Sequence, residues 1–491
     1  MHPTHPSPVP LSANLNENLA HLRTAFDGSG DLVIRSVTVN SRAAAVVTME
    51  GMVQLQMYIQ GVLRPMLEAD YVSCTPAEQL RQMGETVLAL ADQMDVPDFD
   101  LLERLIMSGF CVVLLDGVPA GLGIGMQGYN FRSVGEPSGE TMQRGSREGF
   151  VEVIRINMSM VRRRMKTPRL RFEMLQVGTV SRTDVALCYL DGAVSPHILG
   201  DVRRKLQHCP LTSVLESGYL QPFLESRPAL FSTVGLSERP DTVCGKIAEG
   251  RIAVFVDGTP DVLIVPCLFT EFFQSMDDYA NRPFFATFTR WLKYGAFFLS
   301  VLLPGLFVAV GTWLPSFFPT DLLYRVARSE AEQPFSLMLQ ALLIHLIYEL
   351  MREAGLRLPK PIGHAVSILG GLVIGDAAVQ SGLIGAPMIL IVALTAISSF
   401  VIPQLYEPIA VLRIGFILLG GMLSVYGVVL GFCGLTAHLC ALSSCGIPYT
   451  APLSPTNFRA LRDVLIRAGW PLLGKRTLRI QDLPGAKEDD T

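Results

Sequence analysis

The stretch Ala44-Ala-Val-Val-Thr-Met-Glu-Gly51 has the pattern of a buried strand that ends in an acidic-glycine turn. The stretch Val185-Ala-Leu-Cys-Tyr-Leu-Asp-Gly192 repeats this pattern 141 positions later. Further along, Asp116-Gly117 and Asp257-Gly258 are related by the same offset. A constant offset over a span of this length indicates a duplicated structural unit.

Each copy contains a second strand pattern, Phe110-Cys-Val-Val-Leu-Leu in the first and Arg251-Ile-Ala-Val-Phe-Val in the second. Both runs close on Asp-Gly, which is a strong signal for a tight turn. Helix-like stretches separate the strands of each copy. We therefore predict two tandem α/β subdomains, residues 30–135 and 170–275, with the Asp-Gly pairs acting as turns and having no chemical role.

The composition changes sharply in the second half of the chain. No Asp, Glu, Lys or Arg occurs in the stretches 294–320, 377–406 and 414–458. About 20 apolar residues are enough to cross a bilayer as a helix, and core helices of soluble proteins are seldom free of charge for so long. We predict a transmembrane domain over 284–442, built as a bundle of about 4–6 transmembrane or re-entrant helices.

Five apolar segments lie in this domain, and an amphipathic stretch at 320–332 is expected to lie on the membrane surface. The predicted spans are 294–313, 335–352, 363–381, 385–402 and 409–442. Five simple crossings would place the termini on opposite sides, although the start of the chain and its basic end both have cytosolic character. One segment must therefore re-enter, lie flat or double back, and hydropathy does not choose among them.

The remaining segments are predicted to be a disordered N-terminal segment (1–29), a basic helical linker (136–169) and a cytosolic tail (443–491). The linker ends in a cluster of cations: Arg162, Arg163, Arg164 and Lys166. Cations are favoured at a helix C-terminus, but the same cluster would suit contact with anionic lipid or a neighbouring subunit. Both interpretations stay open on sequence grounds.

Ionisable side chains at membrane depth are costly, so they usually face protein or water. The candidates are Glu349, Asp376 and His345, with the histidine one helical turn before Glu349. Glu349 can also reach the membrane surface, because it lies only three residues before Arg352. We consider Asp376 and Glu349 as parts of a cation-attracting path, and Thr395 and Ser398 as hydroxyls that line or pack the fourth helix.

No common catalytic signature occurs in the sequence. Walker A, HExxH, GxSxG and paired-cysteine patterns are all missing, so we expect no enzyme, no cofactor and no metal site. His438 with Cys433, Cys440 and Cys445 lies in or beside an apolar span, where these side chains are expected to pack. The net charge of −4 is too small to suggest a nucleic-acid partner.

Several motifs resemble the GerA-type A subunits of spore germinant receptors, from about residue 30 to 455. They occur in the order of that family, with departures at Ser146 and His364 that carry no chemistry. The motifs are Gly145-Ser-Arg-Glu-Gly-Phe-Val-Glu, Arg162-Arg-Arg, Val177-Gly-Thr-Val-Ser-Arg-Thr, Glu238-Arg-Pro-Asp, Val256-Asp-Gly-Thr-Pro and Arg357-Leu-Pro-Lys-Pro-Ile-Gly-His-Ala-Val-Ser.

The resemblance implies a multi-pass protein of the spore inner membrane with a cytosolic N-terminal domain. It also implies a transporter-like, nutrient-binding B subunit and a lipoprotein C subunit as partners. In such receptors the A subunit is thought to form a homo-oligomer, a pentamer, that releases monovalent cations. Two alternatives remain: the related stage V sporulation AF protein, which shares this architecture, and a secondary transporter that acts alone, for which an inverted repeat in the membrane half would be expected.

Overall fold

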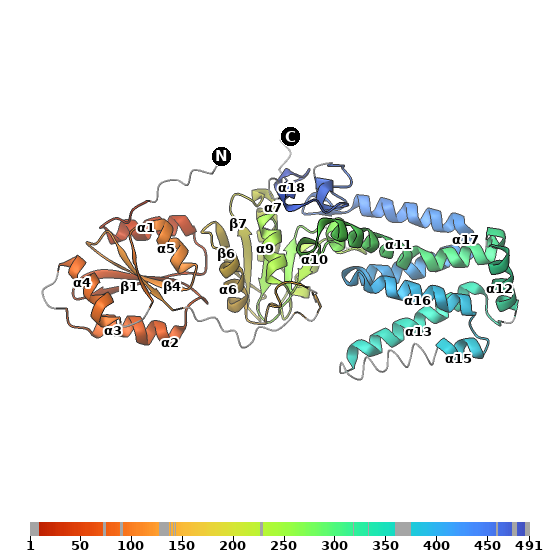
Figure 1. The fold of residues 1–491 in the computed structure, drawn as a ribbon, viewed down its shortest axis with the longest axis horizontal. Coiled ribbons are helices and arrows are strands. Elements are labelled where there is room, and N and C mark those ends of the chain that lie inside the picture. The colour runs from red at the N-terminus through yellow and green to blue at the C-terminus, as the bar shows by residue number, and fades with distance from the viewer. Residues whose placement is uncertain are drawn as a thin grey trace.

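The computed structural model describes residues 9–71, 75–88, 92–126, 137, 139–140, 142, 144–225, 229–317, 319–331, 333–358, 375–457, 460–473 and 479–486. The molecule is elongated, with two sheet-containing subdomains at one end and a helical bundle at the other (Figure 1). Both expected halves of the chain are therefore present.

The first subdomain is a five-stranded sheet in the order β1-β2-β4-β5-β3, and every described strand pair in it is antiparallel. Two of its inner strands, β2 and β4, are rich in Val, Ala and Leu, which pack well on both faces of a covered sheet. The strands are β1 (Leu32–Val39), β2 (Arg42–Met49), β3 (Gln93–Val96), β4 (Phe110–Leu115) and β5 (Gly121–Gly125).

Helices cover both faces of this sheet. On one face α1 (Leu15–Phe26) and α5 (Phe99–Ile106) bury their apolar stripes. On the other face lie α2 (Leu55–Met57), α3 (Arg64–Glu68) and α4 (Pro76–Gln82), with the π-helical segments η1 (Tyr58–Leu63) and η2 (Met83–Val87).

The second subdomain repeats the first, with the strand order β6-β7-β9-β10-β8. This confirms the predicted duplication. Its strands are β6 (Leu170–Val177), β7 (Thr183–Leu190), β8 (Gly235–Ser237), β9 (Ile252–Val256) and β10 (Val262–Val265). Its helices are α6 (Ile154–Arg164) and α9 (Pro240–Ala248) on one face, and α7 (Pro196–Gln207) and α8 (Gln221–Leu224) on the other.

Each repeat begins earlier than the sequence suggested. The Oδ1 atom of Asp116 accepts a hydrogen bond from the backbone N–H of Leu15 at the start of α1, and Oδ1 of Asp257 does the same for Ile154 at the start of α6. The two Asp-Gly turns therefore also satisfy a free N–H at a helix N-terminus, which corrects the prediction that they have no such role.

Two predicted boundaries are wrong for this reason. The segment 1–29 was expected to be disordered, but α1 packs Leu15, Leu19, Leu22 and Phe26 into the first core. The segment 136–169 was expected to be a linker, but it contains α6, the first helix of the second repeat. Residues 1–8 lie outside the described residues.

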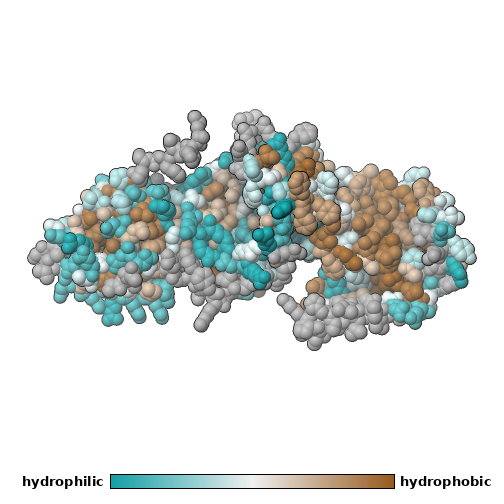
Figure 2. Space-filling view, in the orientation of Figure 1, coloured by the Kyte–Doolittle hydropathy of each residue, from teal (hydrophilic) through white to brown (hydrophobic). Residues whose placement is uncertain are grey.

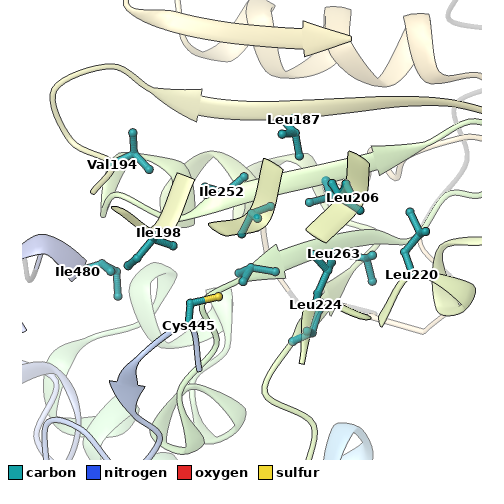
Figure 3. Close-up of a cluster of buried hydrophobic side chains, with 14 of the residues drawn as sticks. Leu187, Val194, Ile198, Leu206, Leu220, Leu224, Ile252, Leu263, Cys445 and Ile480 are labelled. Atoms are coloured by element: carbon teal, nitrogen blue, oxygen red, sulfur yellow. The ribbon is translucent and has the colours of Figure 1, made fainter. Parts of the chain in front are cut away.

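The C-terminal segment belongs to the second subdomain. It contains β11 (Ser443–Ser444), β12 (Ile447–Pro448) and α18 (Trp470–Leu473). Cys445, Ile447 and Ile480 are buried in the same cluster as Ile198 and Leu263 of the second subdomain (Figure 3). The segment predicted as a tail therefore completes one face of a folded core.

The bundle is joined to the second subdomain through α10 (Met276–Ala280) and the long helix α11 (Pro283–Trp313). The other bundle helices are α12 (Thr320–Ala331), α13 (Leu337–Arg357), α15 (Gly375–Gln380), α16 (Ala386–Phe400) and α17 (Tyr406–Ala441). α12 lies at the end of the bundle farthest from the subdomains (Figure 1). Most of the predicted span 363–381 lies outside the described residues.

Helix α17 reverses direction at Ser424, whose φ of 62° and ψ of −159° are not helical. A Cβ on Gly431 would lie 2.6 Å from a Leu419 side-chain atom, although 12 residues of straight helix span about 18 Å. α17 is therefore a hairpin of two antiparallel helices. Of the three possibilities that hydropathy left open, this segment doubles back.

By length and composition, two helical segments in the described part of the chain are long and apolar enough to cross a membrane: α11 and Pro403–Ala441. The second segment contains α17, so its length is divided between the two arms of the hairpin. On the face of the molecule shown in Figure 2, hydrophobic residues predominate over the middle of the bundle, and hydrophilic residues lie at its far end. Large exposed apolar side chains occur on several bundle helices, including Phe298, Leu350, Leu390, Phe400 and Leu430. An apolar surface of this extent indicates contact with lipid or protein rather than with water.

Candidate functional site

A cluster of polar side chains lies inside the bundle, where α11, α13 and α17 meet. The Nη1 atom of Arg413 on α17 lies 3.6 Å from Oε1 of Glu349 on α13, and its Nε donates a 3.2 Å hydrogen bond to the carbonyl oxygen of Ser300 on α11. Arg413 is 1% exposed. One buried guanidinium thus connects three helices of the bundle.

Glu349 is held by two further groups. Arg352 Nε donates to Oε2 of Glu349 at 3.3 Å, and the hydroxyl of Tyr406 donates to the same oxygen. The guanidinium carbon of Arg352 also lies 3.6 Å from the centre of the Tyr406 ring. The carboxylate is therefore surrounded by two arginines and does not present an unpaired negative charge, as a cation-attracting residue would.

Three buried polar atoms beside this cluster have no hydrogen-bond partner among the described residues: His345 Nε2, Tyr348 Oη and Arg413 Nη2. His345 Nδ1 bonds to the carbonyl oxygen of Ala341, which leaves Nε2 as the available ring atom. Buried polar groups are nearly always satisfied, so an unpaired set in one place suggests water, an ion or another conformation.

The other predicted intramembrane residues do not join this cluster. Asp376 is exposed on α15, and its Oδ2 accepts a hydrogen bond from Gln380 at 2.7 Å. Thr395 and Ser398 are buried on α16, where the Thr395 hydroxyl donates to the carbonyl oxygen of Ile391. In this chain the two hydroxyl residues therefore pack within the bundle.

The four cations at the end of α6 make contacts inside the chain. Arg162, which is 1% exposed, pairs with Asp31 at 2.8 Å. Arg163 and Arg164 both pair with Glu148, and Lys166 Nζ lies 3.1 Å from Ser108 Oγ. A surface role is wrong for Arg162, because the C-terminus of α6 faces the first subdomain.

The base of α11 is fixed to the second subdomain by a buried ionic network. Arg290, which is 0% exposed, pairs with Asp278 of α10 at 3.1 Å and with Asp463 of the C-terminal segment at 3.4 Å. Nearby, Glu271 pairs with Arg251 and Lys246, each at 2.6 Å. Burial alone would raise the pKa of Glu271, but these two cations outweigh it and hold the pKa below its usual value.

Sequence reasoning identified Glu349 and His345 but missed Arg413 and Tyr406. Arg413 interrupts a stretch from 377 to 458 that otherwise contains only one charged side chain, Glu407. An arginine within an apolar stretch predicts an acidic partner elsewhere in the bundle. In the sequence, Arg413 marks the boundary between two charge-free runs, and the pattern does not identify its partner.

The fold separates His438 from the three cysteines near it in the sequence. His438 lies beside Phe231, with ring centres 6.4 Å apart, whereas Cys433 and Cys440 are exposed on α17. Cys445 is buried in the second subdomain. In the described part of the chain, no group of three or more His, Cys, Asp or Glu side chains is placed to hold a metal ion.

Comparison with known proteins identifies the family. The model of the Bacillus/Clostridium GerA spore germination protein matches residues 20–478. This chain belongs to the GerA family. It is 37% identical to spore germination protein KA of Bacillus subtilis (strain 168) over 94% of this chain and 86% of that protein.

Other GerA relatives match over similar lengths. The chain is 37% identical to the uncharacterized membrane protein YfkQ of Bacillus subtilis (strain 168), over 98% of this chain and 94% of that protein. It is 32% identical to spore germination protein GerLA of Bacillus cereus, over 96% of each chain. The crystal structure of the N-terminal domain of the A subunit of the Bacillus megaterium spore germinant receptor GerK3 aligns with 54% of this chain and 99% of that domain, at 32% identity and a TM-score of 0.42.

Proposed function

We propose that this GerA-family chain is the A subunit of a nutrient germinant receptor in the spore inner membrane. In this proposal it crosses the membrane several times, keeps its two subdomains in the cytosol and assembles into a homo-oligomer of five copies. Nutrient binding by a transporter-like B subunit, with a lipoprotein C subunit present, opens a path through which monovalent cations leave the spore.

The observation that carries this proposal is the polar cluster around Glu349 and Arg413 inside an apolar bundle. Ionisable groups are retained at membrane depth where they serve a path or a conformational switch. The pair joins α13 to α17, and Arg413 also contacts α11. Loss of the pair would allow these helices to separate, which is the kind of change that opens a path between helices.

The connection between bundle and subdomains supports gating by a partner. The Arg290 network fixes the base of α11, and the C-terminal segment that follows α17 packs into the second subdomain. A movement of this subdomain would therefore act on the first and the last helix of the bundle together. A partner can shift such an equilibrium only if it binds one of the two states more tightly.

The experiment is potassium release from purified spores that lack this gene, challenged with a panel of amino acids and sugars. We expect loss of release for one class of nutrient, restored by the wild-type gene. Release that is unchanged for every nutrient, in a strain that lacks the other receptors of this kind, would reject the proposal. It would favour the accessory role of a stage V sporulation AF relative.

A further inference from the structure

A cavity of about 720 Å³ lies where the second subdomain meets the bundle. Its walls come from α9, α10, the base of α11, the connection between α16 and α17, and the C-terminal segment. It is separate from the Glu349 cluster. Sites for small organic molecules typically have volumes of about 300–1,000 Å³, so the space suits a ligand of that size.

The charged groups that line this cavity are predominantly acidic. Five carboxylates and three cations contribute to the wall; the carboxylates are Glu140, Glu249, Glu271, Asp277 and Asp463. Each of the cations already has a carboxylate partner: Lys246 pairs with Glu271, Lys293 with Asp278, and Arg239 with Asp241. An anionic ligand would have to displace one of these partners.

Asp277 is the carboxylate that needs a partner most. Its Oδ1 atom is buried and has no hydrogen bond from any described residue. Its neighbour Asp278, by contrast, is paired with Arg290 and Lys293. An ammonium group in the cavity would donate a hydrogen bond to this oxygen, because a buried polar atom without a partner is unfavourable.

The apolar part of the lining combines aliphatic side chains with four aromatic ones. Phe272, Tyr279, Phe400 and Trp470 all contribute to it. The Trp470 ring already has the Arg467 guanidinium at 5.0 Å from its centre. Aromatic faces attract organic cations, and a wall that combines them with carboxylates favours an ammonium group attached to an apolar body.

A metal ion is a poorer match for the same space. No suitable group of three or more ligands occurs in the described part of the chain, and the cavity is far larger than a metal site.

Two carboxyl groups of the lining, Asp463 and Glu140, have a raised pKa. Burial raises the pKa of each above its usual value. A bound cation would favour the ionised forms of both.

We propose that this cavity binds a small organic ammonium ion between Asp277 and the aromatic wall. The source of the ammonium group is either a free amine or the headgroup of phosphatidylethanolamine. The lipid is considered because the first turns of α11 carry the exposed aromatic residues Phe284, Phe288 and Trp291, a pattern of membrane interfaces. The site is independent of the receptor role proposed above.

The test uses the full-length chain in nanodiscs of phosphatidylglycerol and isothermal titration calorimetry, with benzylamine as the probe and benzyl alcohol as its neutral analogue. We expect saturable binding of benzylammonium, and binding of the alcohol at least about tenfold weaker, since a charge-assisted contact is lost. Asp277→Asn should weaken benzylammonium binding by a similar factor. Asp95→Asn, at an exposed site in the first subdomain, should leave it unchanged.

Trp470→Leu is the second variant, because Trp470 is 58% exposed and its loss does not threaten the core. It should weaken binding by roughly threefold through loss of the cation–π contact.

The same titration in nanodiscs that contain phosphatidylethanolamine distinguishes the two sources of the ammonium group. Weaker benzylammonium binding there assigns the cavity to the lipid headgroup, and equal binding assigns it to a soluble amine. Three results would each overturn the proposal. They are absence of saturable binding, equal affinity for benzylamine and benzyl alcohol, and benzylammonium binding that neither Asp277→Asn nor Trp470→Leu weakens. None of these outcomes bears on potassium release.

Discussion

Helices α11 and α17 cross at Gly305 and Gly420, where their backbones are in contact. A Cβ on Gly420 would lie 2.3 Å from the carbonyl oxygen of Gly305, and a Cβ on Gly305 would lie 2.5 Å from the carbonyl oxygen of Phe416. Small residues allow membrane helices to approach this closely. The crossing therefore requires glycine on both helices.

Gly420→Ala should destabilise the bundle, because the added methyl group would push α17 away from α11. We expect a loss of about 1–3 kcal/mol in the free energy of unfolding, the usual cost of overpacking. The measurement is the unfolding temperature of the purified chain in detergent. Gly434→Ala is the matched control: a Cβ there meets no atom within 4 Å, so its unfolding temperature should be unchanged or raised. Equal effects of the two substitutions would contradict the close crossing.

The ion pair between Glu349 and Arg413 gives a second prediction. Glu349→Gln leaves the buried Arg413 without its carboxylate, which typically costs about 3–5 kcal/mol. We expect lower thermal stability, and spores that release potassium without nutrient if the pair holds the path closed. Arg413→Met combined with Glu349→Gln should recover much of the stability, because no buried charge remains.

The control for this pair is Glu353→Gln. Glu353 is one turn along the same helix and pairs with Arg357 at an exposed position, where an ion pair contributes about 0–1 kcal/mol. If Glu349→Gln behaves like this control in both assays, the cluster has no structural or gating importance.

Asp376 tests the earlier idea of a cation-attracting residue. Because Asp376 is exposed in the single chain, Asp376→Asn should leave the protein level unchanged. If Asp376 faces the path in the assembled oligomer, the rate of nutrient-triggered potassium release should change. An unchanged rate at a normal protein level would remove Asp376 from the path, and a reduced level alone would make it a structural residue.

The sequence predicted the repeated sheets well, because strands such as Val185–Leu190 carry local patterns of apolar residues and turns. It did not predict the role of α1, although Leu15, Leu19, Leu22 and Phe26 have helical spacing. The segment begins with Pro-rich, polar residues, a composition that is typical of a disordered terminus. The reversal at Ser424 has only a general signal in the sequence: the glycines of this segment make it, like the segment 363–381, a candidate to break or double back. The position of the turn depends on packing between its two arms.

The candidate site was predicted only in part for a related reason. His345 and Glu349 share one helix, so their spacing brings them together in any model of that helix. Arg413 lies 64 residues after Glu349, and their contact depends on how α13 and α17 pack. A single sequence contains no direct record of such a pairing. The contact between Arg162 and Asp31, 131 residues apart, was missed in the same way.

Glu103 provides a prediction about pH. Burial, with a smaller contribution from the nearby Asp100, raises the pKa of this carboxyl group from 4.5 to about 6. The folded state therefore binds protons more tightly than the unfolded state between about pH 6 and pH 4.5, so the contribution of Glu103 to the free energy of unfolding increases as the pH falls through that window. At pH 7 the charged group is a penalty.

Glu103→Gln should remove this penalty. We expect the free energy of unfolding at pH 7 to rise by about 1–2 kcal/mol, allowing for partial exposure of the side chain, and the advantage to disappear near pH 4.5. Thermal unfolding at the two pH values measures both. Asp100→Asn, which removes only the neighbouring charge, should produce a smaller gain. A gain that is the same at both pH values would exclude ionisation of Glu103 as its cause.

The joint between the two subdomains depends on the buried pair of Arg162 and Asp31. Both side chains are at most 3% exposed, and Ser29 and the carbonyl oxygen of Thr167 complete the hydrogen bonds of the guanidinium. Arg162→Met should leave Asp31 buried without a cation and cost about 3–5 kcal/mol. Hydrogen exchange should then accelerate in β6 and in the turn that follows α1. These two segments meet at the joint, where the Gly30 N–H donates a hydrogen bond to the carbonyl oxygen of Phe172. Arg204→Met, which removes an exposed pair with Asp201, should change exchange little, and equal acceleration in both variants would show that the joint does not depend on the buried pair.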